Sequence, residues 1–233
     1  MKLQRFFTGY SCEANRLNAP IRIPSLELRH QLKSVFRLGK GDNVILFDNS
    51  GYDFVARIEG FDDEAVTFTL LEKRENTVTP KRETHLFAAI VKKDTFEWIA
   101  EKATELGVSH IIPIITDRTE KKDVNFERLE KIIREAAEQS GRSTLPELHE
   151  VMELEDALKK FGEIKSIAWE PTASKFAAED LENTSGTYIG PEGGWTPREL
   201  ELFKQHSVLV RSLGPQILRA ETAVVVALSK LVF

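Results

Sequence analysis

The fold is decided by the stretch TYIGPEGGWTP at residues 187–197, in which an apolar strand runs into a glycine turn and then into a helix. The stretch VLVRSLGP at residues 208–215 has the same order and leads into another apolar helix. In α/β proteins such turns present backbone amides to a ligand at the carboxyl ends of strands. Two of them so close together predict one ligand site with two walls; the alternative is that each is only a tight structural turn.

Strand-like and helical patterns alternate through the second part of the chain. Strands are expected at residues 86–91, 110–115, 148–152, 164–169, 188–189 and 208–213. Helices are expected at residues 95–106, 126–140, 154–161, 197–206 and 218–231. This alternation predicts the α/β class, with a mostly parallel sheet covered by helices on both faces.

The first part of the chain has a pattern typical of a small β-barrel with one helix. Content of the β type falls at residues 3–7, 43–49, 52–59 and 64–72, with a hairpin turn at 48–51. Ser25 is placed to cap the helix. The pattern is lost around Pro80, at residues 76–83, so we expect two domains, 1–75 and 76–233.

Composition describes a globular chain. Of its 233 residues, 41% are apolar, which suffices for a buried core. The single cysteine, Cys12, rules out an internal disulfide and a cysteine-based zinc site. Apolar stretches fall far short of the ~20 residues that a membrane span needs, and the N-terminus lacks the apolar region of a signal peptide. We therefore expect a cytoplasmic protein.

Charge is unevenly distributed along the chain. The first 41 residues hold eight Lys or Arg against two acids, whereas the remainder holds 24 basic and 35 acidic residues. A basic segment on an acidic body is a plausible nucleic-acid footprint, because phosphate contacts dominate such binding. A solvated basic surface explains the charge equally well.

The charged residues near the glycine turns suggest a ligand other than a nucleoside triphosphate. The turn at 190–194 lacks the residues of a phosphate loop and the spacing of a dinucleotide fingerprint. Glu192 adds a carboxylate, which suits hydroxyls or a positive charge. Arg219 is unfavourable at the amino end of a helix, so we expect it to contact a phosphate or carboxylate. Glu221 fits either a catalytic role or a favourable position in the first helical turn.

The five histidines show no metal-binding motif. They are scattered at His30, His85, His110, His149 and His206. Because no pair of them has ligand spacing, no metal is expected.

Linked segments across the chain carry a family resemblance. They are residues 101–108, 136–142, 189–194, 213–214 and 217–223, together with Arg5-Phe6-Phe7, Arg29-His30 through Arg37, and Gly41-Asp42. In this order they resemble the signatures of the RsmE family of ribosomal RNA methyltransferases. The resemblance implies a PUA-like β-barrel RNA-binding domain joined to a SPOUT methyltransferase domain, with a trefoil knot at about 187–233. It also implies a homodimer packed through the knotted regions.

The activity implied by the resemblance is transfer of a methyl group from S-adenosylmethionine to N3 of a uridine in 16S ribosomal RNA, on the small ribosomal subunit. The cofactor pocket would be lined by Ile189, Gly190, Pro191, Gly193, Gly194, Leu213, Gly214, Ile217 and Leu218. N3 becomes a nucleophile only as its proton leaves. Arg219 is therefore the candidate to stabilise the resulting charge, and Glu221 or Glu192 the candidate to accept the proton.

The basic N-terminal segment then has RNA as its partner. The residues expected on the RNA-binding surface are Arg5, Arg29, His30, Arg37 and Arg142, and binding should weaken steeply with salt. Two positions depart from the family pattern: Gln216 stands where Arg is expected, and Phe36 where Leu is more usual. The first departure removes a cation near the cofactor turn.

Three other functions remain open at this point. A knotted methyltransferase could act on transfer RNA or on another ribosomal position, because fold alone does not fix function. A ribosome-assembly factor could bind RNA without catalysis, although the intact glycines argue against such decay. An α/β oxidoreductase is disfavoured by the missing dinucleotide fingerprint.

Overall fold

The computed structural model describes residues 3–78, 82–120 and 122–233, and the chain divides into two compact units. The first comprises Met1–Thr79 with Ala137–Leu145, and the second comprises Pro80–Ala136 with Pro146–Phe233. The predicted boundary at 76–83 includes residues 79–81, which lie outside the described residues. The return of Ala137–Leu145 to the first unit had no signal in the sequence.

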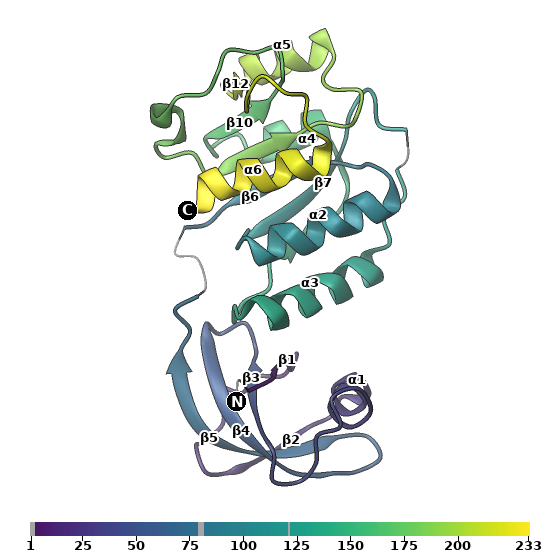
Figure 1. The fold of residues 1–233 in the computed structure, drawn as a ribbon, viewed down its shortest axis with the longest axis vertical. Helices are drawn as coiled ribbons and strands as arrows, with labels where there is room; N and C mark the ends of the chain where they lie inside the picture. Colours follow the sequence, from purple (N-terminus) through teal and green to yellow (C-terminus); the bar gives the residue numbers. More distant parts are fainter. Residues whose placement is uncertain (1–2, 79–81, 121) are drawn as a thin grey trace. The chain divides into compact units, whose positions relative to one another are not determined.

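The first unit is built on a five-stranded sheet with the order β1-β3-β4-β5-β2 (Figure 1). Its strands are β1 (Arg5–Phe7), β2 (Pro20–Ile23), β3 (Asn43–Phe47), β4 (Tyr52–Phe61) and β5 (Val66–Glu75). All neighbours are antiparallel except β1 and β3. Two register irregularities between β4 and β5 increase the local twist and help the sheet curve around its core. Phe6, Phe54 and Phe68 are fully or almost fully buried in that core.

One short helix packs on this sheet, as the sequence predicts. In α1 (Leu26–His30), the Ser25 hydroxyl accepts a hydrogen bond from the Leu28 amide at 3.1 Å. The chain continues as a π-helix, η1 (Gln31–Val35), which buries Leu32 beside Leu28. The predicted hairpin turn joins β3 to β4, whereas the edge strand β2 was missed because Pro20 begins it.

Residues 137–145 are tied to the first unit by hydrogen bonds. The Glu138 carboxylate accepts from the Phe7 amide at 2.9 Å and from the Gln31 side chain at 2.7 Å. The Asn76 amide group donates to the Gly141 carbonyl at 2.9 Å. Gly141 has a φ of +90°, as suits the glycine that ends a helix.

The second unit is built on a parallel sheet with the order β12-β10-β11-β6-β7-β8, in which β9 also pairs with β7. Its strands are β6 (His85–Ala89), β7 (His110–Ile115), β8 (Glu147–Leu148), β9 (Met152–Glu153), β10 (Ser166–Trp169), β11 (Gly186–Ile189) and β12 (Leu209–Arg211). The central strands are buried along their whole length, as expected for a sheet covered on both faces. The predicted parallel sheet is therefore confirmed.

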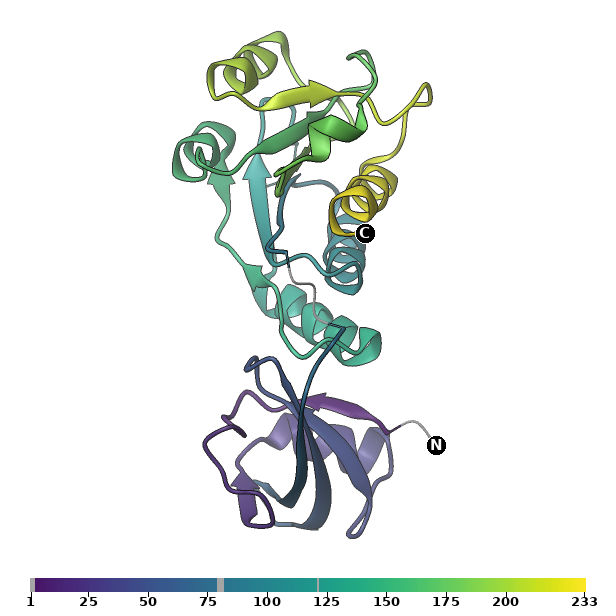
Figure 2. The same cartoon turned by 90° about the vertical axis from the view of Figure 1, so that its left-hand side faces the viewer.

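Helices cover both faces of this sheet. They are α2 (Lys93–Glu105), α3 (Phe126–Ser140), α4 (Leu154–Lys160), α5 (Pro197–Gln205) and α6 (Ala220–Val232), with a 3₁₀ turn η2 (Ala178–Leu181). Seen along the sheet, α2 and α6 lie on one face and α4 and α5 on the other (Figure 2). Among the described residues, no helix combines the length and the apolar character needed to cross a membrane.

The strand order brings the two glycine turns together. Strand β10 lies between β11 and β12 and is parallel to both. The segments that follow these three strands therefore emerge at one edge of the sheet, the carboxyl edge. Both glycine turns belong to this edge.

Candidate functional site

A cavity of about 250 Å³ lies at the carboxyl edge of the second unit's sheet. Its walls come from the three segments that follow β10, β11 and β12, and from the start of α6. This arrangement matches the predicted site with two walls and adds a third segment, residues 169–171, between them.

The cavity gathers most of the residues expected to hold a cofactor. Those that line it are Ile189, Gly190, Pro191, Gly194, Leu213, Gly214, Ile217 and Leu218. Gly193 does not line it; it lies in an adjoining hollow, where its carbonyl accepts a hydrogen bond from the Arg118 guanidinium. Gln216, which stands in place of the expected Arg, also lines the cavity.

Trp169 and Trp195, which the sequence pattern did not predict at the site, form part of the cavity wall. The Trp195 indole donates to the Trp169 carbonyl at 3.0 Å and meets the Phe203 ring edge-on, with a centroid distance of 4.8 Å. A Cβ at Gly190 would lie 3.1 Å from the Trp195 ring, closer than ordinary packing allows. Trp195 therefore explains why the end of β11 needs a glycine.

The charged groups around the cavity are two carboxylates and one guanidinium. Glu170, which the sequence reading did not single out, lines it together with Glu192 and Arg219. The Glu170 carboxylate accepts from the Thr172 hydroxyl at 3.0 Å and lies near Gly194, whose φ of +68° favours glycine. The two carboxylates in the cavity wall suit a ligand that carries hydroxyls and a positive charge.

Of the two candidate catalytic residues at the start of α6, Arg219 lines the cavity and Glu221 does not. Arg219 is exposed at the N-cap position of α6, and its guanidinium makes no hydrogen bond or ion pair with the residues that the structure describes. Glu221 lies in the first turn of α6, half-buried, and does not line the cavity. This position fits the favourable interaction of an acid with the helix dipole, the other role considered for Glu221.

Glu192 borders two hollows. Besides the cavity, it lines an adjoining hollow of about 590 Å³ with Lys92, Arg118 and Gly193. Asp117 and Glu120 also line this second hollow, so its two cations stand among three carboxylates. The Glu192 side chain thus lies at the border between the cavity and this hollow, where ligands bound in the two would come close to each other.

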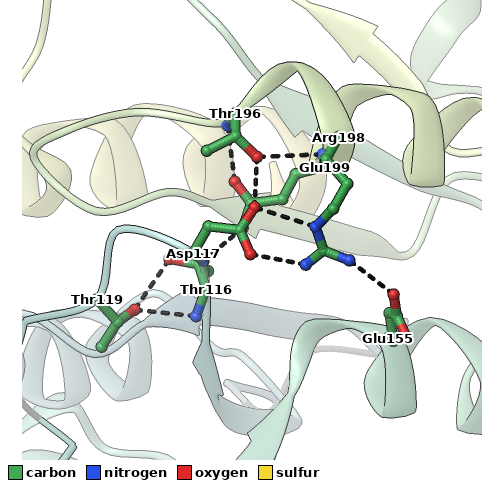
Figure 3. Close-up of polar contacts among 7 residues, drawn as sticks. All are labelled: Thr116, Asp117, Thr119, Glu155, Thr196, Arg198 and Glu199. Carbon is green, nitrogen blue, oxygen red and sulfur yellow. Dashed lines mark hydrogen bonds and ion pairs between the residues drawn. The ribbon is translucent and has the colours of Figure 1, made fainter.

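A polar cluster fixes the turn that carries these residues (Figure 3). The Thr196 hydroxyl accepts from the Glu199 amide at 3.3 Å, and the Glu199 carboxylate accepts from the Thr196 amide at 2.7 Å, which is a capping box. Buried Glu199 also accepts from the Asp117 amide at 2.9 Å. The loop after β7 and the start of α5 are thereby joined.

An ion-pair network completes the cluster. The Arg198 guanidinium donates to Asp117 at 2.7 Å and to Glu155 at 2.7 Å (Figure 3). The hydrogen bond from Arg198, followed by that from Thr196, lowers the pKa of the Asp117 carboxyl. The glycine turn is thus held in place before any ligand arrives, which reduces the ordering cost of binding.

The residues expected on an RNA surface fall into two groups. His30 and Arg37 are exposed, and half-buried Arg29 donates to the Asp62 carbonyl at 2.8 Å. The Arg5 guanidinium instead forms a bidentate ion pair with the two carboxylate oxygens of Asp53, at 2.6 and 2.8 Å. The Arg5 side chain is only 7% exposed. Arg142 is buried, and burial lowers its pKa to about 10. As a correction, Arg5 and Arg142 do not present their guanidiniums at the surface.

Two family models and several relatives match this chain. A family model described as an RNA methyltransferase domain matches residues 78–232, and one described as an RNA methyltransferase PUA domain matches residues 29–71. Ribosomal RNA small subunit methyltransferase E of Rickettsia conorii is 35% identical over 219 residues, which cover 91% of this chain and 89% of the relative.

Two solved structures with a bound cofactor resemble the chain. A methyltransferase from Legionella pneumophila in complex with SAM is 29% identical with a TM-score of 0.88, and the match covers 99% of this chain and 97% of that one. Ribosomal RNA small subunit methyltransferase E from Neisseria gonorrhoeae, bound to S-adenosyl methionine, is 26% identical with a TM-score of 0.87. That match covers 98% of this chain and 96% of the other.

Proposed function

From the premise that the chain belongs to the RNA methyltransferase family that includes ribosomal RNA small subunit methyltransferase E, we propose that it methylates 16S ribosomal RNA with S-adenosylmethionine as donor. The proposed position is N3 of a uridine, and the proposed substrate is the small ribosomal subunit. The observation that carries this proposal is the cavity at the carboxyl edge, whose walls are the two glycine turns.

The residues present fit the proposed cofactor. The cavity volume of about 250 Å³ is close to the lower end, roughly 300 Å³, of the range for small-molecule pockets. A ligand the size of a nucleoside would therefore fill it. Backbone groups of the two glycine turns are available to the adenine and ribose, and Glu170 offers a carboxylate to hydroxyls or to the sulfonium. Bound there, the sulfonium would supply an already activated methyl group.

The path of the chain supports a SPOUT fold with a trefoil knot at about 187–233. After β12, at the outer edge of the sheet, Ser212 bridges to the segment after β10, where its amide donates to the Ser174 carbonyl at 2.9 Å. The chain then returns across β10, and α6 packs against β11 and α2. We propose that residues 213–219 pass through the loop formed by the segment after β10.

The chemistry proposed for the site divides between two side chains. As uracil N3 loses its proton, negative charge develops on the ring oxygens, and the unpaired Arg219 guanidinium is the group that stabilises it. Glu192, which borders both hollows, is the proton acceptor that we favour over Glu221. The backbone of the glycine turns aligns the donor with the nucleophile.

RNA would be held by the basic face of the first unit. Arg29, His30 and Arg37 are its proposed contacts. Phosphate contacts of this kind position an RNA, while the target base enters its pocket by leaving the stack.

We also propose a homodimer that packs through the knotted region. Ile217 is 86% exposed and Phe233 is 89% exposed, and Trp98 of α2 is 39% exposed. Large apolar side chains in solvent near α6 and α2 mark a surface for a partner. Because the proposed substrate is the small ribosomal subunit, we also propose a cytoplasmic location.

The proposal is tested by methyl transfer to small ribosomal subunits from a strain that lacks the gene. Labelled S-adenosylmethionine is supplied, and the nucleosides of the product are identified by mass spectrometry. Appearance of N3-methyluridine is the expected result. Another methylated nucleoside would indicate a different RNA position, and absence of transfer with cofactor binding intact would indicate another RNA substrate. Absence of both transfer and cofactor binding would point to a non-catalytic assembly factor.

A further inference from the structure

Three histidines that are far apart in the sequence meet at the edge of the second unit's sheet opposite the cavity. His85 begins β6 and pairs in register with His110, which begins β7. His110 in turn pairs with Glu147, which begins β8, and His149 follows two residues later. Because the strands are parallel, all of these residues lie at the amino edge of the sheet.

Three of these side chains form a compact triangle of possible ligand atoms. His110 Nδ1 lies 3.0 Å from His149 Nε2 and 3.4 Å from one Glu147 oxygen, and His149 Nε2 lies 3.7 Å from the other Glu147 oxygen. Zinc–ligand bonds of about 2.0–2.1 Å place the ligands of a tetrahedral site roughly 3.3–3.4 Å apart. The two Glu147 distances go to different oxygens, but one candidate ligand atom from each of the three residues lies within 4.8 Å of the others, which is close enough for the three to share one ion.

A fourth side chain orients the central histidine. The Glu83 carboxylate lies 2.6 Å from His110 Nε2 and accepts a hydrogen bond from it, so that nitrogen carries the proton of the neutral ring. His110 Nδ1 is then a lone-pair acceptor aimed at His149 and Glu147. A carboxylate behind a histidine is the usual outer partner of a metal ligand, because it fixes the tautomer and raises the basicity of the ring.

The rings are also held by packing. His85 stacks on His110 with a centroid distance of 4.2 Å and an interplanar angle of 10°, and its buried Nδ1 makes no hydrogen bond within the described part of the chain. This stack fixes the plane of the His110 ring.

We propose that His110, His149 and Glu147 bind one divalent zinc ion, with Glu83 as the carboxylate that orients His110 and with water as the fourth ligand. A set of two imidazoles and one carboxylate binds zinc in preference to magnesium or calcium. The Glu147 side chain is 64% exposed, which leaves an open path for the ion. The ion links the starts of β7 and β8 and has no part in methyl transfer.

Zinc binding changes the tautomer of one ring. In the metal-free cluster, His149 donates from Nε2 to His110 Nδ1. For both nitrogens to bind the ion, the Nε2 proton of His149 leaves and Nδ1 takes one up, so the ring keeps one proton and no net proton is released there.

The test uses the full chain without an affinity tag, stripped of metal and titrated with Zn²⁺ in competition with a chromophoric chelator. One ion per chain is expected, and Co²⁺ should show the strong visible absorption of a four-coordinate site. His149→Gln and the surface variant Glu147→Gln should each lose most of the affinity. Glu83→Gln should weaken it about 10- to 100-fold.

His206→Gln is the matched control, because His206 lies at the end of α5, away from the cluster. Its affinity and Co²⁺ spectrum should equal those of the wild type. Unchanged zinc affinity in both His149→Gln and Glu147→Gln overturns the proposal, as does failure of the wild type to bind one equivalent at micromolar Zn²⁺. In the latter case the cluster is only a hydrogen-bonded group of histidines. The outcome is independent of whether the chain methylates RNA.

Discussion

Arg219 is the cation that lines the cavity, and its guanidinium has no partner among the described residues. Since no structural bond is lost, Arg219→Ala should leave the fold and S-adenosylmethionine affinity close to wild type. It should lower kcat about 10²- to 10³-fold, as does the loss of one group that stabilises transition-state charge. Single-turnover methyl transfer measures the effect.

Lys204→Ala is the matched control for Arg219, because Lys204 is an exposed cation on α5, with its side chain 80% exposed. Its turnover should equal that of the wild type. If Arg219→Ala methylates at the wild-type rate, the charge-stabilising role assigned to Arg219 is wrong.

Cys12 gives the first unit a dependence of stability on alkaline pH. Burial raises the pKa of its thiol to about 12, whereas the unfolded value is about 9. The folded state therefore keeps a proton that the unfolded state loses, so the stability is fully present below pH 9 and falls as the pH rises towards 12. Between pH 8 and pH 10 the loss should be about 1.4 kcal/mol. Urea unfolding at both pH values, compared with Cys12→Ala, measures it; an equal loss in the variant contradicts the assignment.

The glycine turns could be predicted from the sequence as a ligand site, but the side chains around them could not. Nothing in the pattern near Trp169 and Glu170 indicates that β10 lies between β11 and β12, so their place in the cavity wall depends on strand order. The histidine cluster is not visible in the sequence for the same reason. Their spacing along the chain says nothing until the register of β6, β7 and β8 is known.

At the scale of elements, α5 depends on a buried acid. Glu199 is 0% exposed and accepts hydrogen bonds from the amides of Asp117 and Thr196. Glu199→Ala leaves both amides without this acceptor, which should cost about 1–3 kcal/mol of unfolding free energy. The glycine turn should also loosen, so the affinity for S-adenosylmethionine should fall.

Urea unfolding and calorimetric titration test this prediction. Exposed Glu201 on the same helix supplies the control, since Glu201→Ala removes a carboxylate whose one ion pair within the described residues is with Lys204 across 3.9 Å. That control should change stability by less than about 0.5 kcal/mol. Equal effects of the two substitutions would show that the buried position has no special importance.

Most elements follow from local sequence, because apolar runs and helical periodicity are strong local signals. The predicted helix at 126–140 and the strand at 110–115 coincide with α3 and β7. The misses have tertiary causes: Pro20 hides the edge strand β2, and residues 137–145 join the first unit through contacts with Phe7, Gln31 and Asn76.

At the scale of the whole molecule, RNA affinity should depend on the exposed cations of the first unit. Arg37→Ala should weaken binding to the small ribosomal subunit, and it should reduce the slope of log affinity against log salt by about 1. Arg74→Ala is the control, because Arg74 is an exposed arginine of β5 outside the proposed surface. Filter binding over a range of salt concentrations measures both slopes. Parallel slopes for wild type and Arg37→Ala would remove Arg37 from the RNA surface.

The position of the tryptophans has an optical consequence. Two of the three tryptophans in the chain, Trp169 and Trp195, line the cavity, while Trp98 lies on α2. Their buried indoles should dominate a blue-shifted emission, and an adenine or sulfonium bound beside them should quench it. The protein thus carries an intrinsic fluorophore for its own ligand, and Trp98→Phe should leave that quenching unchanged. Titration of emission against S-adenosylmethionine would report occupancy without a label, and a signal unaffected by saturating ligand would place the cofactor elsewhere.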